Sequence, residues 1–470
     1  MEVIFLSSEV APWSKTGGLG DVAGALPKAL ALRGHRVRVV TPLYPDVPRK
    51  DLERHGAPLT LRFPFGNVEL QAHRLRVDGI EVFFIDAPSF FARERYYGFP
   101  DDARRFTAFS MGALTLMQRD GFDAQVVHAN DWPTGIALYA LRTGFAHTPL
   151  GKARRVFTIH NLAYQGLFPK SELDPLGIPW SAFTPEGVEF YDQLSFLKTA
   201  LVCADALTTV SPSYAKEIQT QRFGVGLDGL LRHRASKLTG ILNGIDTGVW
   251  NPATDVFLPV QFTDTELAGR AKCRAELIAS CRIEAPAARM PLYGVIGRMA
   301  SQKGADLIHG ALPKLLEQGA SVVVLGSGEH AIESAWKTLE ARYPKRIGLR
   351  LGFDESLAHR IEAGSDFFLM PSKFEPCGLN QMYSLRYGSV PIVHAVGGLK
   401  DTVIDVSDEA NGNGILFEQP TVDSLFKALV RSIELFRDEA KYRTVQKRGM
   451  KADFGWDHAA RRYEQVYSAQ

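Results

Sequence analysis

Short runs of apolar residues, many of them β-branched, recur along this chain, and each is followed by a turn and a longer stretch with helical spacing. The runs are apolar throughout and do not alternate with polar residues, which is typical of strands covered on both faces. Such strands form parallel sheets under helices, so the pattern predicts an α/β protein. The predicted strands are 2–7, 36–42, 81–86, 124–130, 154–161 and 205–211 in the first half, and 292–298, 321–327, 346–353, 366–372 and 389–395 in the second.

Two doubly wound, Rossmann-like domains are expected, because 470 residues exceed the size at which one hydrophobic core stops growing. The strand–helix rhythm pauses at 240–255, where Gly, Asn, Asp and Pro lie close together. We therefore predict one domain over residues 1–243 and a second over residues 244–454. Doubly wound sheets bind ligands at the carboxyl ends of their strands, so the two domains are expected to face each other across a cleft.

The near balance of basic and acidic residues limits the kinds of binding partner that are expected. The chain has 54 basic and 52 acidic residues, whereas proteins that bind nucleic acid or anionic membranes usually carry a basic excess. No apolar stretch reaches about 18 residues, and the N-terminus lacks the features of a signal peptide. The four cysteines include no C-x-x-C pair, which argues against a metal knuckle and for a reducing compartment. We predict a cytoplasmic protein with no nucleic-acid or membrane partner.

The stretch KTGGLGDVAG contains four glycines, and three of them, Gly17, Gly18 and Gly20, lie where predicted strand 2–7 gives way to a helix that stops near Gly34. Glycines let backbone N–H groups approach an anion, a helix N-terminus favours negative charge, and Lys15 would add a positive charge. The spacing matches neither G-x-G-x-x-G nor G-x-x-x-x-G-K-[ST], and no acidic residue ends strand 36–42 to hold a ribose. From these residues alone, an anion-binding turn and a tight turn without a ligand both stay open.

Several polar residues follow predicted strands. His160 stands at the end of strand 154–161, as a functional group facing the cleft or as an ordinary hydrogen-bonded histidine. Arg298 ends strand 292–298, and Lys303 precedes a helix. Two cations near a helix N-terminus suit a diphosphate, and the alternative is a pair of solvated surface charges.

The segment PSKFEPCGLNQMYSLRYG, residues 371–388, is the most informative part of the chain. A predicted strand ends at Met370, a loop carries Glu375, and a helix starts near Leu379. The helix N-terminus would stabilise the Glu375 carboxylate, and its unpaired backbone N–H groups could hold sugar hydroxyls or a phosphate. An ordinary acidic residue at a helix start is the alternative.

Other motifs add weaker signals. Asp131 follows strand 124–130, and the polar loop 93–102 carries Tyr96 and Tyr97, which suit either stacking on sugar rings or packing of the loop. The chain has no H-E-x-x-H motif, no G-x-S-x-G motif and no clustered carboxylate pair. Their absence argues against zinc proteases, α/β-hydrolases and hydrolytic glycosidases.

Taken together, these motifs resemble those of bacterial glycogen synthases and plant starch synthases, a family of retaining glucosyltransferases with a fold of the GT-B type. Each motif is modestly specific, but the set in this order is highly specific and covers roughly residues 2–460. The matching segments are KTGGLGDV, TIHNLAYQG, TVSPSYAKEI, GILNGID, VWNP, QKGADL, FEPCGLNQMYSLRYG and GGLKDTV.

The resemblance implies that glucose passes from ADP-glucose to the non-reducing end of an α-1,4-glucan, such as glycogen or a maltooligosaccharide, with retention. It implies no metal and no other cofactor, because fixed positive groups take the role of a divalent cation. The transition state should resemble an oxocarbenium ion, which Glu375 would stabilise electrostatically without acting as a covalent nucleophile.

The same resemblance assigns roles to residues of this chain. The catalytic group is Glu375, His160, Arg298 and Lys303. The donor side comprises Lys15, Gly17, Gly18, Cys377, Gly378, Leu379, Asn380 and Tyr383, and the acceptor side comprises Asp21, Asp131, Asn243, Tyr96 and Tyr97. Lys15, Arg298 and Lys303 would neutralise the leaving diphosphate. The family's last helix often returns to the N-terminal domain, and residues 455–470 fit that helix.

The chain departs from the family pattern in a few places. Asn130 and Pro133 stand where the family usually has histidines, Lys373 replaces a common arginine, Asn380 a common threonine, and Gly297 a usual serine. The changes around Asp131 leave the acceptor preference open. A same-fold transferase that uses UDP-glucose or another acceptor is one alternative, and a non-catalytic protein that binds nucleotide sugar or glucan is another. A nicotinamide-dependent oxidoreductase is disfavoured, because this chain lacks the glycine motif and the ribose-binding acidic residue of such enzymes.

Overall fold

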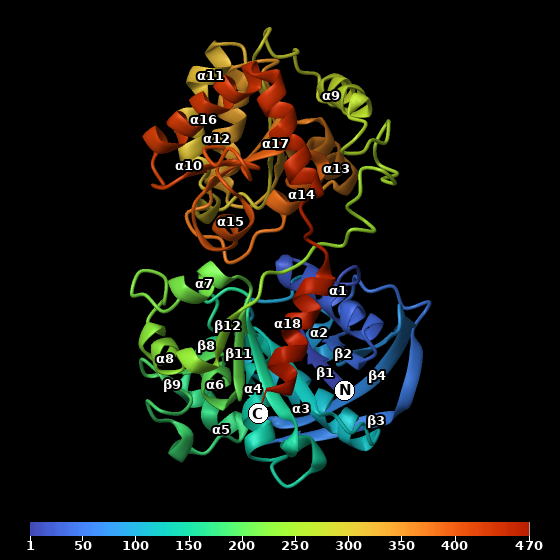
Figure 1. The fold of residues 1–470 in the computed structure, drawn as a ribbon. Coiled ribbons are helices and arrows are strands. Elements are labelled where there is room, and N and C mark those ends of the chain that lie inside the picture. Colours follow the sequence, from blue (N-terminus) through green and yellow to red (C-terminus); the bar gives the residue numbers. More distant parts are fainter. Residues whose placement is uncertain (470) are drawn as a thin grey trace. The chain divides into compact units, whose positions relative to one another are not determined.

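The computed structural model describes residues 1–469, which form two compact units (Figure 1). Unit 1 comprises Met1–Gly244 and the C-terminal segment that begins at Trp456, and unit 2 comprises Ile245–Gly455. Each unit has its own α/β sheet with parallel strands at its centre. None of the described helices is both long enough and apolar enough to cross a membrane.

Unit 1 is built on a nine-stranded sheet with the order β12-β11-β7-β6-β1-β2-β5-β4-β3. From β12 to β5 all neighbouring strands are parallel, as the uniformly apolar runs predict. The strands are β1 (Glu2–Leu6), β2 (Arg36–Pro42), β3 (Glu53–Phe63), β4 (Gly66–Val77), β5 (Ile80–Asp86), β6 (Val126–Asn130), β7 (Arg154–Ile159), β11 (Ala206–Thr209) and β12 (Leu238–Gly240).

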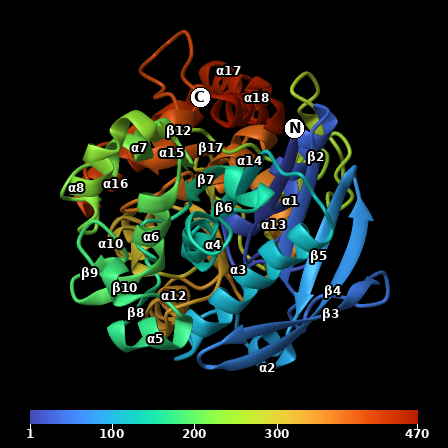
Figure 2. The ribbon, with the colours of Figure 1, turned by 90° about the horizontal axis from the view of Figure 1, so that it is seen from below.

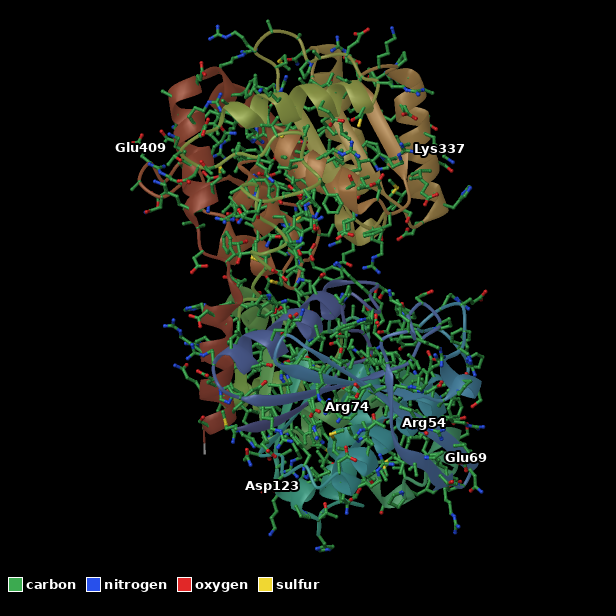
Figure 3. The ribbon with its side chains drawn as sticks, turned by 90° about the vertical axis from the view of Figure 1, so that its right-hand side faces the viewer. Arg54, Glu69, Arg74, Asp123, Lys337 and Glu409 are labelled. Carbon is green, nitrogen blue, oxygen red and sulfur yellow. The ribbon has the colours of Figure 1, made fainter. Side chains whose placement is uncertain are left out.

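The hairpin β3–β4 is absent from the sequence-based prediction, which had only parallel strands. It adds to the sheet antiparallel to β5. On β4 the buried side chains Val68, Leu70 and Ala72 alternate with more exposed ones, because only one face of the hairpin is covered. The charged side chains of Arg54, Glu69 and Arg74 belong to this hairpin (Figure 3).

A small antiparallel sheet of β8 (Leu167–Pro169), β9 (Glu189–Phe190) and β10 (Gln193–Ser195) is also unpredicted. Figure 2 shows this sheet and the β3–β4 hairpin at the periphery of unit 1. The helices of unit 1 are α1 (Gly18–Leu32), α2 (Pro88–Phe91), α3 (Asp102–Arg119), α4 (Trp132–Arg142), α5 (Leu173–Leu176), α6 (Phe196–Cys203), α7 (Pro212–Glu217), α8 (Asp228–His233) and α18 (Trp456–Ser468).

Helix α18, near the C-terminal end of the chain, packs on α1, the first helix of unit 1 (Figure 1). Arg33 makes ion pairs with Asp457 and Glu464 at 2.8 and 2.9 Å. The Tyr467 hydroxyl lies 2.8 Å from Nδ1 of buried His128 on β6. The last helix therefore packs both on α1 and against the central sheet of unit 1.

Unit 2 contains a six-stranded parallel sheet with the order β15-β14-β13-β16-β17-β18. Both of its faces are buried: on β14, Val322 and Val324 belong to one apolar cluster, whereas Val323 and Leu325 belong to another. The strands are β13 (Leu292–Ile296), β14 (Ser321–Gly326), β15 (Ile347–Leu351), β16 (Phe367–Met370), β17 (Val390–His394) and β18 (Ile415–Phe417). All strands predicted from the sequence of both units form, with ends that differ by a few residues.

The helices of unit 2 alternate with these strands. They are α9 (Ala268–Ser280), α10 (Ala305–Ala311), α11 (Pro313–Glu317), α12 (His330–Arg342), α13 (Glu355–Gly364), α14 (Asn380–Tyr387), α15 (Gly397–Thr402), α16 (Val422–Arg437) and α17 (Glu439–Lys451). Helix α16 shows why such helices cover the sheet, because Leu425, Ala428, Leu429 and Ile433 form one buried stripe along it.

Candidate functional site

The strand order of each unit reverses at one point, and ligands of doubly wound folds bind at the carboxyl ends of the strands there. In unit 1 the reversal lies between β1 and β6, and in unit 2 between β13 and β16. Lys15 and Asp131 follow β1 and β6, whereas Arg298 and Glu375 follow β13 and β16. Residues selected from sequence motifs thus fall at the switch point of each sheet.

In unit 2, Glu375 and Lys303 form a buried ion pair. Lys303 Nζ lies 2.6 Å from Glu375 Oε2, and Ser372 Oγ donates a hydrogen bond of 2.9 Å to the same oxygen. Glu375 is 6% exposed, and within the described residues no hydrogen bond reaches its Oε1. Oε1 is therefore the oxygen that can accept a hydroxyl of a bound sugar.

Lys303 therefore contacts the carboxylate directly, a contact that the motifs do not reveal. It ends the 3₁₀ turn Ser301–Lys303, and Gly304 continues the chain in the left-handed region with φ of 73°. Arg298 lies two residues beyond β13, after Gly297. Both cations are held by short segments that leave the carboxyl end of one central strand.

Helix α14 points its N-terminus toward this carboxyl edge. It begins at Asn380 after Leu379, as predicted, and no side chain of the described residues caps it. Asn380 Nδ2 donates to the carbonyl oxygen of Ile296 at 2.9 Å, which ties the first turn of α14 to the end of β13. An uncapped helix N-terminus has backbone donors and a positive dipole end for a phosphate.

Gln381 fixes the turn before α14 and was missed by sequence reasoning. Its Nε2 donates to the carbonyl oxygens of Cys377 and Gly378, each at 3.0 Å. Gly378 adopts φ of 72°, and a Cβ there would meet Gln381 Oε1 at 2.4 Å. The shape of this turn therefore depends on a glycine and on a buried amide, and only the glycine stood out in the sequence.

The glycine pair at the start of α15 supports the Glu375 loop from behind. A Cβ at Gly397 would lie 1.9 Å from the carbonyl oxygen of Glu375, and one at Gly398 would lie 2.2 Å from that of Cys377. The Gly398 N–H donates to the Glu375 carbonyl at 3.2 Å. These two glycines thus permit a backbone-to-backbone contact that positions the loop.

Tyr383, predicted on the donor side, is held by an aromatic stack. The Trp250 ring lies between His359 and Tyr383, with centroid distances of 3.8 Å to each. His359 Nδ1 lies 2.7 Å from Asp255, which also accepts a hydrogen bond from the Tyr387 hydroxyl. The stack ties the segment after the domain boundary to helices α13 and α14.

Phe353 is a further residue that the motifs missed. It follows β15 at the carboxyl edge of the same sheet and is 85% exposed. An exposed ring gives a flat apolar face, which suits stacking on a planar group. The signal available in the sequence was an aromatic residue at the end of the predicted strand 346–353.

In unit 1, the opening glycine turn begins α1 as predicted. Gly17 precedes the helix, Gly18 is its first residue, and no side chain of the described residues caps it. A Cβ at Gly17 would meet nothing within 4 Å, so the fold itself leaves room there. Lys15 Nζ pairs with Asp21 in the first turn at 2.6 Å, which joins a residue predicted on the donor side to one predicted on the acceptor side.

Glu9 braces this turn and was also missed. Its carboxylate is buried and accepts hydrogen bonds from the Thr16 hydroxyl at 2.6 Å and from the Tyr97 hydroxyl at 2.7 Å. Tyr96 stacks on Tyr44 at 4.1 Å, and its hydroxyl donates to Asp46. Both loop tyrosines are thus packed within unit 1, and their role toward an acceptor stays a prediction.

Asp131 and His160 lie side by side at the carboxyl edge of unit 1. Asp131 Oδ1 accepts hydrogen bonds from the backbone N–H of His160 at 2.7 Å and of Asn161 at 3.4 Å. Asp131 has φ of 54°, a conformation that few non-glycine residues adopt. Its carboxylate therefore positions the loop that carries His160.

Burial sets the charge states of this pair. Loss of solvent raises the pKa of Asp131 to about 7, and the charge of Glu9 adds to that rise. Loss of solvent also lowers the pKa of His160 to about 3. His160 is therefore neutral near pH 7 and acts there through hydrogen bonds.

Asn130 determines which nitrogen of His160 carries the proton. Asn130 Nδ2 donates to the carbonyl oxygen of Leu6 at 3.0 Å, so its Oδ1 faces His160 Nε2 at 2.9 Å. Nε2 must then carry the hydrogen, and Nδ1 is left as an acceptor. Asn130 is one of the departures from the family pattern, and the structure gives it this positioning role.

Asn243, predicted on the acceptor side, is 5% exposed. Its Oδ1 is buried without a hydrogen-bond partner among the described residues. A buried acceptor without a partner costs free energy, so a ligand hydroxyl at this atom would be stabilising.

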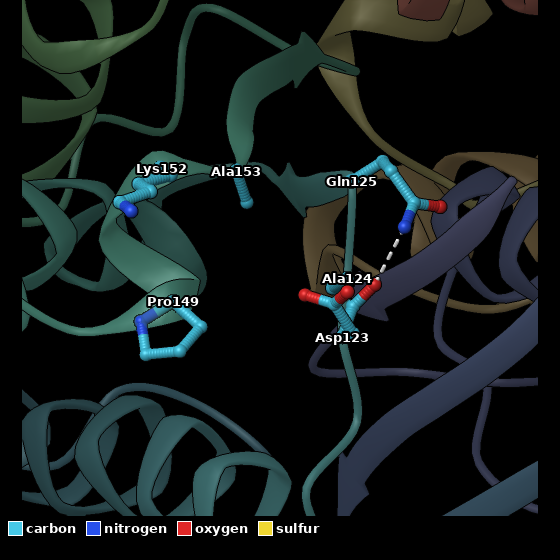
Figure 4. A pocket seen from close by; sticks show the side chains of 6 residues that line it. All are labelled: Asp123, Ala124, Gln125, Pro149, Lys152 and Ala153. Atoms are coloured by element: carbon cyan, nitrogen blue, oxygen red, sulfur yellow. Dashed lines mark hydrogen bonds between the residues drawn. The ribbon is translucent and has the colours of Figure 1, made fainter.

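A hollow of unit 1 lies elsewhere. It holds about 360 Å³ and lies where β6 and β7 begin, lined by Asp123–Gln125, Pro149, Lys152 and Ala153 (Figure 4). Gln125 Nε2 donates to the Asp123 carbonyl oxygen at 2.7 Å within it. It is thus at the amino edge of the sheet, away from Lys15, Asp131 and His160. Among residues 1–469, no group of three or more His, Cys, Asp or Glu residues is placed to hold a metal ion.

Each of the two doubly wound units has an uncapped helix N-terminus and a lysine beside a carboxylate at its switch point, an arrangement that fits a glycosyltransferase of the two-Rossmann-domain type. The starch synthase catalytic domain model matches residues 2–233, and the model of group 1 glycosyl transferases matches residues 282–451.

Curated relatives extend this match over the whole chain. A glycogen synthase of Myxococcus xanthus is 52% identical, and one of Anaeromyxobacter dehalogenans is 49% identical, with 99% of each chain covered in both cases. The catalytic domain of starch synthase IV from Arabidopsis thaliana, bound to ADP and acarbose, superposes with a TM-score of 0.94 at 36% identity, covering 99% of this chain and 98% of that one. The chain belongs to the glycogen and starch synthase family of glucosyltransferases.

A more distant structure shares the fold alone. Sucrose-phosphate synthase from Thermosynechococcus elongatus gives a TM-score of 0.62 at 18% identity, with 99% of this chain and 98% of that chain covered. The GT-B architecture expected from the motifs is thus confirmed by the fold of a family member and of a remoter transferase.

Proposed function

We propose that this protein transfers glucose from ADP-glucose to the non-reducing end of an α-1,4-glucan, with retention at the anomeric carbon. The observation that carries the proposal is the buried Glu375–Lys303 pair beside the uncapped N-terminus of α14, at the switch point of unit 2. The family supports the reaction, and the starch synthase IV structure was obtained with ADP and acarbose bound.

Unit 2 would bind the donor. The positive end of α14, Arg298 and Lys303 supply the charge that a leaving diphosphate needs, so turnover is expected without a divalent cation. Lys303 would exchange part of its contact with Glu375 for a phosphate oxygen when the donor binds. Glu375 Oε1 would then accept a glucose hydroxyl, and the carboxylate would stabilise positive charge at the anomeric centre.

Unit 1 would act on the transferred sugar and on the acceptor. Neutral His160 offers Nδ1 as a hydrogen-bond acceptor for a sugar hydroxyl, because Nε2 is committed to Asn130. Asp131 and Asn243 supply further polar atoms for hydroxyl groups of a glucan. The glycine turn at Gly17, where nothing lies within 4 Å of a Cβ position, leaves room for a ligand close to the backbone.

Radiolabel transfer tests the proposal. The purified protein is incubated with glycogen and labelled ADP-glucose, or in parallel labelled UDP-glucose, with EDTA present. We expect label in the polymer from ADP-glucose at an unchanged rate with EDTA. Label from UDP-glucose alone would overturn the donor, inhibition by EDTA that added Mg²⁺ restores would overturn metal independence, and no label from either donor would overturn glucan synthesis.

A further inference from the structure

Unit 2 contains a polar cavity that lies outside the candidate site described above. It holds about 360 Å³, and five arginines line it together with two acidic and two aromatic residues. We call it the arginine pocket, defined by Arg270, Arg274, Arg289, Asp366, Phe436, Arg437, Glu439, Tyr442 and Arg443.

The arginine pocket lies at the amino edge of the sheet. Asp366 directly precedes β16, and its Oδ2 accepts a hydrogen bond of 2.8 Å from the N–H of Leu292, the first residue of β13. Arg298 and Glu375 leave the carboxyl ends of the same two strands. Because the strands are parallel, the two sites are at opposite edges of the sheet.

The floor of the pocket is charged and buried. Arg270 is 4% exposed, and its Nε donates to the carbonyl oxygen of Tyr387 at 3.1 Å. Asp366 is also 4% exposed, and it pairs with Arg274 at 3.0 Å and more distantly with Arg270 at 4.0 Å. One carboxylate thus serves two arginines, which leaves an excess of positive charge at the base of the cavity.

The rim adds three further cations. Arg443 makes a single long ion pair of 3.9 Å with the exposed Glu439. Within residues 1–469, the side chains of Arg289 and Arg437 make no ion pair and no hydrogen bond. Arg289 also stands in the left-handed region, with φ of 65°. Five arginines against two carboxylates give the pocket a net positive charge, and two of its guanidinium groups are available to a ligand.

We propose that the arginine pocket binds a small phosphate-bearing molecule, a phosphate monoester or a diphosphate. Guanidinium groups pair with phosphate oxygens in a fork geometry, and several converging on one cavity favour an anion with more than one charge. A cavity of this size encloses a small molecule, not a protein segment. Phe436 and the buried Tyr442 give apolar surface for the organic part of such a ligand.

Calorimetric titration of the full-length protein with pyrophosphate and with inorganic phosphate tests the proposal. The pocket variant is Arg289→Gln combined with Arg437→Gln, because both side chains are exposed and unpaired, so the fold does not depend on them. The matched control is Lys337→Gln combined with Lys427→Gln, which removes the same charge from exposed positions on α12 and α16 (Lys337 is labelled in Figure 3). A third protein, Arg298→Gln combined with Lys303→Gln, reports binding at the carboxyl edge.

We expect the pocket variant to bind pyrophosphate at least about tenfold more weakly than the wild type, the scale of losing charged hydrogen bonds. The control should bind pyrophosphate as the wild type does. The Arg298→Gln, Lys303→Gln protein should still bind pyrophosphate at the arginine pocket. Equal affinity in the pocket variant and in the control would overturn the proposal, as would binding that only the Arg298→Gln, Lys303→Gln protein loses. Tighter binding of pyrophosphate than of phosphate would favour a diphosphate, and the reverse order a monoester.

Discussion

The chemistry proposed for this glucosyltransferase uses a few buried polar side chains whose partners are now defined. Lys303 and Ser372 both contact Oε2 of Glu375, and among the described residues Oε1 accepts no hydrogen bond. His160 is neutral, and Asn130 fixes its tautomer. Because both groups are buried, their hydrogen bonds and charges act with little screening from water.

Replacement of Glu375 tests its role in the chemical step. Glu375→Ala should lower kcat by at least ~10²-fold, because it removes the carboxylate that we propose stabilises the developing positive charge. Glu355→Ala is the control, since Glu355 is an exposed acid in the first turn of α13. Steady-state rates of glucosyl transfer measure both variants. A folded Glu375→Ala protein with near-normal kcat would contradict the role.

The raised pKa of Asp131 makes a prediction about stability and pH. The carboxyl is harder to ionise in the folded protein, with a pKa of about 7 against an ordinary value of 3.8, so the folded state holds the proton more tightly. This contribution therefore lowers the free energy of unfolding as pH rises from about 4 to about 7, and it is constant above that window. Asp131→Asn keeps an oxygen that can accept the His160 N–H, and it removes the free-energy cost of ionising a buried carboxyl group.

The thermal midpoint of Asp131→Asn should rise relative to the wild type between about pH 4 and pH 7. Asp123→Asn serves as the control, because Asp123 is an exposed carboxylate at the opposite edge of the sheet (Figure 4). A constant difference between Asp131→Asn and the wild type over this range would show that Asp131 has an ordinary pKa.

At the scale of elements, the site depends on turns that bring backbones into contact. Helix α14, the loop before it and the start of α15 form one packed unit, because Gly397 and Gly398 have no side chain to separate them. Gln381 ties the turn to its own helix, and Asn380 ties that helix to β13. The position of Glu375 is thus a property of three elements together.

Gly397→Ala should displace the Glu375 loop and lower kcat by about 10²-fold, the scale of an ångström of misplacement in a catalytic geometry. The new Cβ would lie 1.9 Å from the Glu375 carbonyl oxygen, and a residue with φ of 45° is strained unless it is glycine. Gly144→Ala is the control, because nothing lies within 4 Å of its Cβ position. Equal kcat in the two variants would mean that the loop does not depend on this contact.

Uniform apolar runs were sufficient to predict most of the parallel strands, because most of these are buried on both faces, but the three-residue edge strands β12 and β18 were missed. The β3–β4 hairpin was missed, since Val68, Leu70 and Ala72 alternate with polar residues and form no apolar run. The motifs located Glu375, Lys303 and His160 at strand ends. Their partners could not be read from sequence, because the Glu375–Lys303 contact spans 72 residues and the tautomer of His160 depends on a carbonyl of β1.

At the scale of the whole molecule, the two units have doubly wound sheets of the same design. Each presents a helix N-terminus without a side-chain cap at its switch point, and each holds a lysine against a carboxylate there. Within residues 1–469, the four cysteines form no disulfide bond. The same design separates the carboxyl edges, where the chemistry is proposed, from the amino edges, where the two hollows lie.

Hydrogen–deuterium exchange over the full chain, with and without ADP, tests most directly whether the carboxyl edge of unit 2 is the nucleotide site. We expect slower exchange in the presence of ADP for the amides of residues 297–305 and 375–381, which include Arg298, Lys303 and the start of α14. Unchanged exchange in both segments at saturating ADP, or protection confined to the amino edge of that sheet, would contradict it.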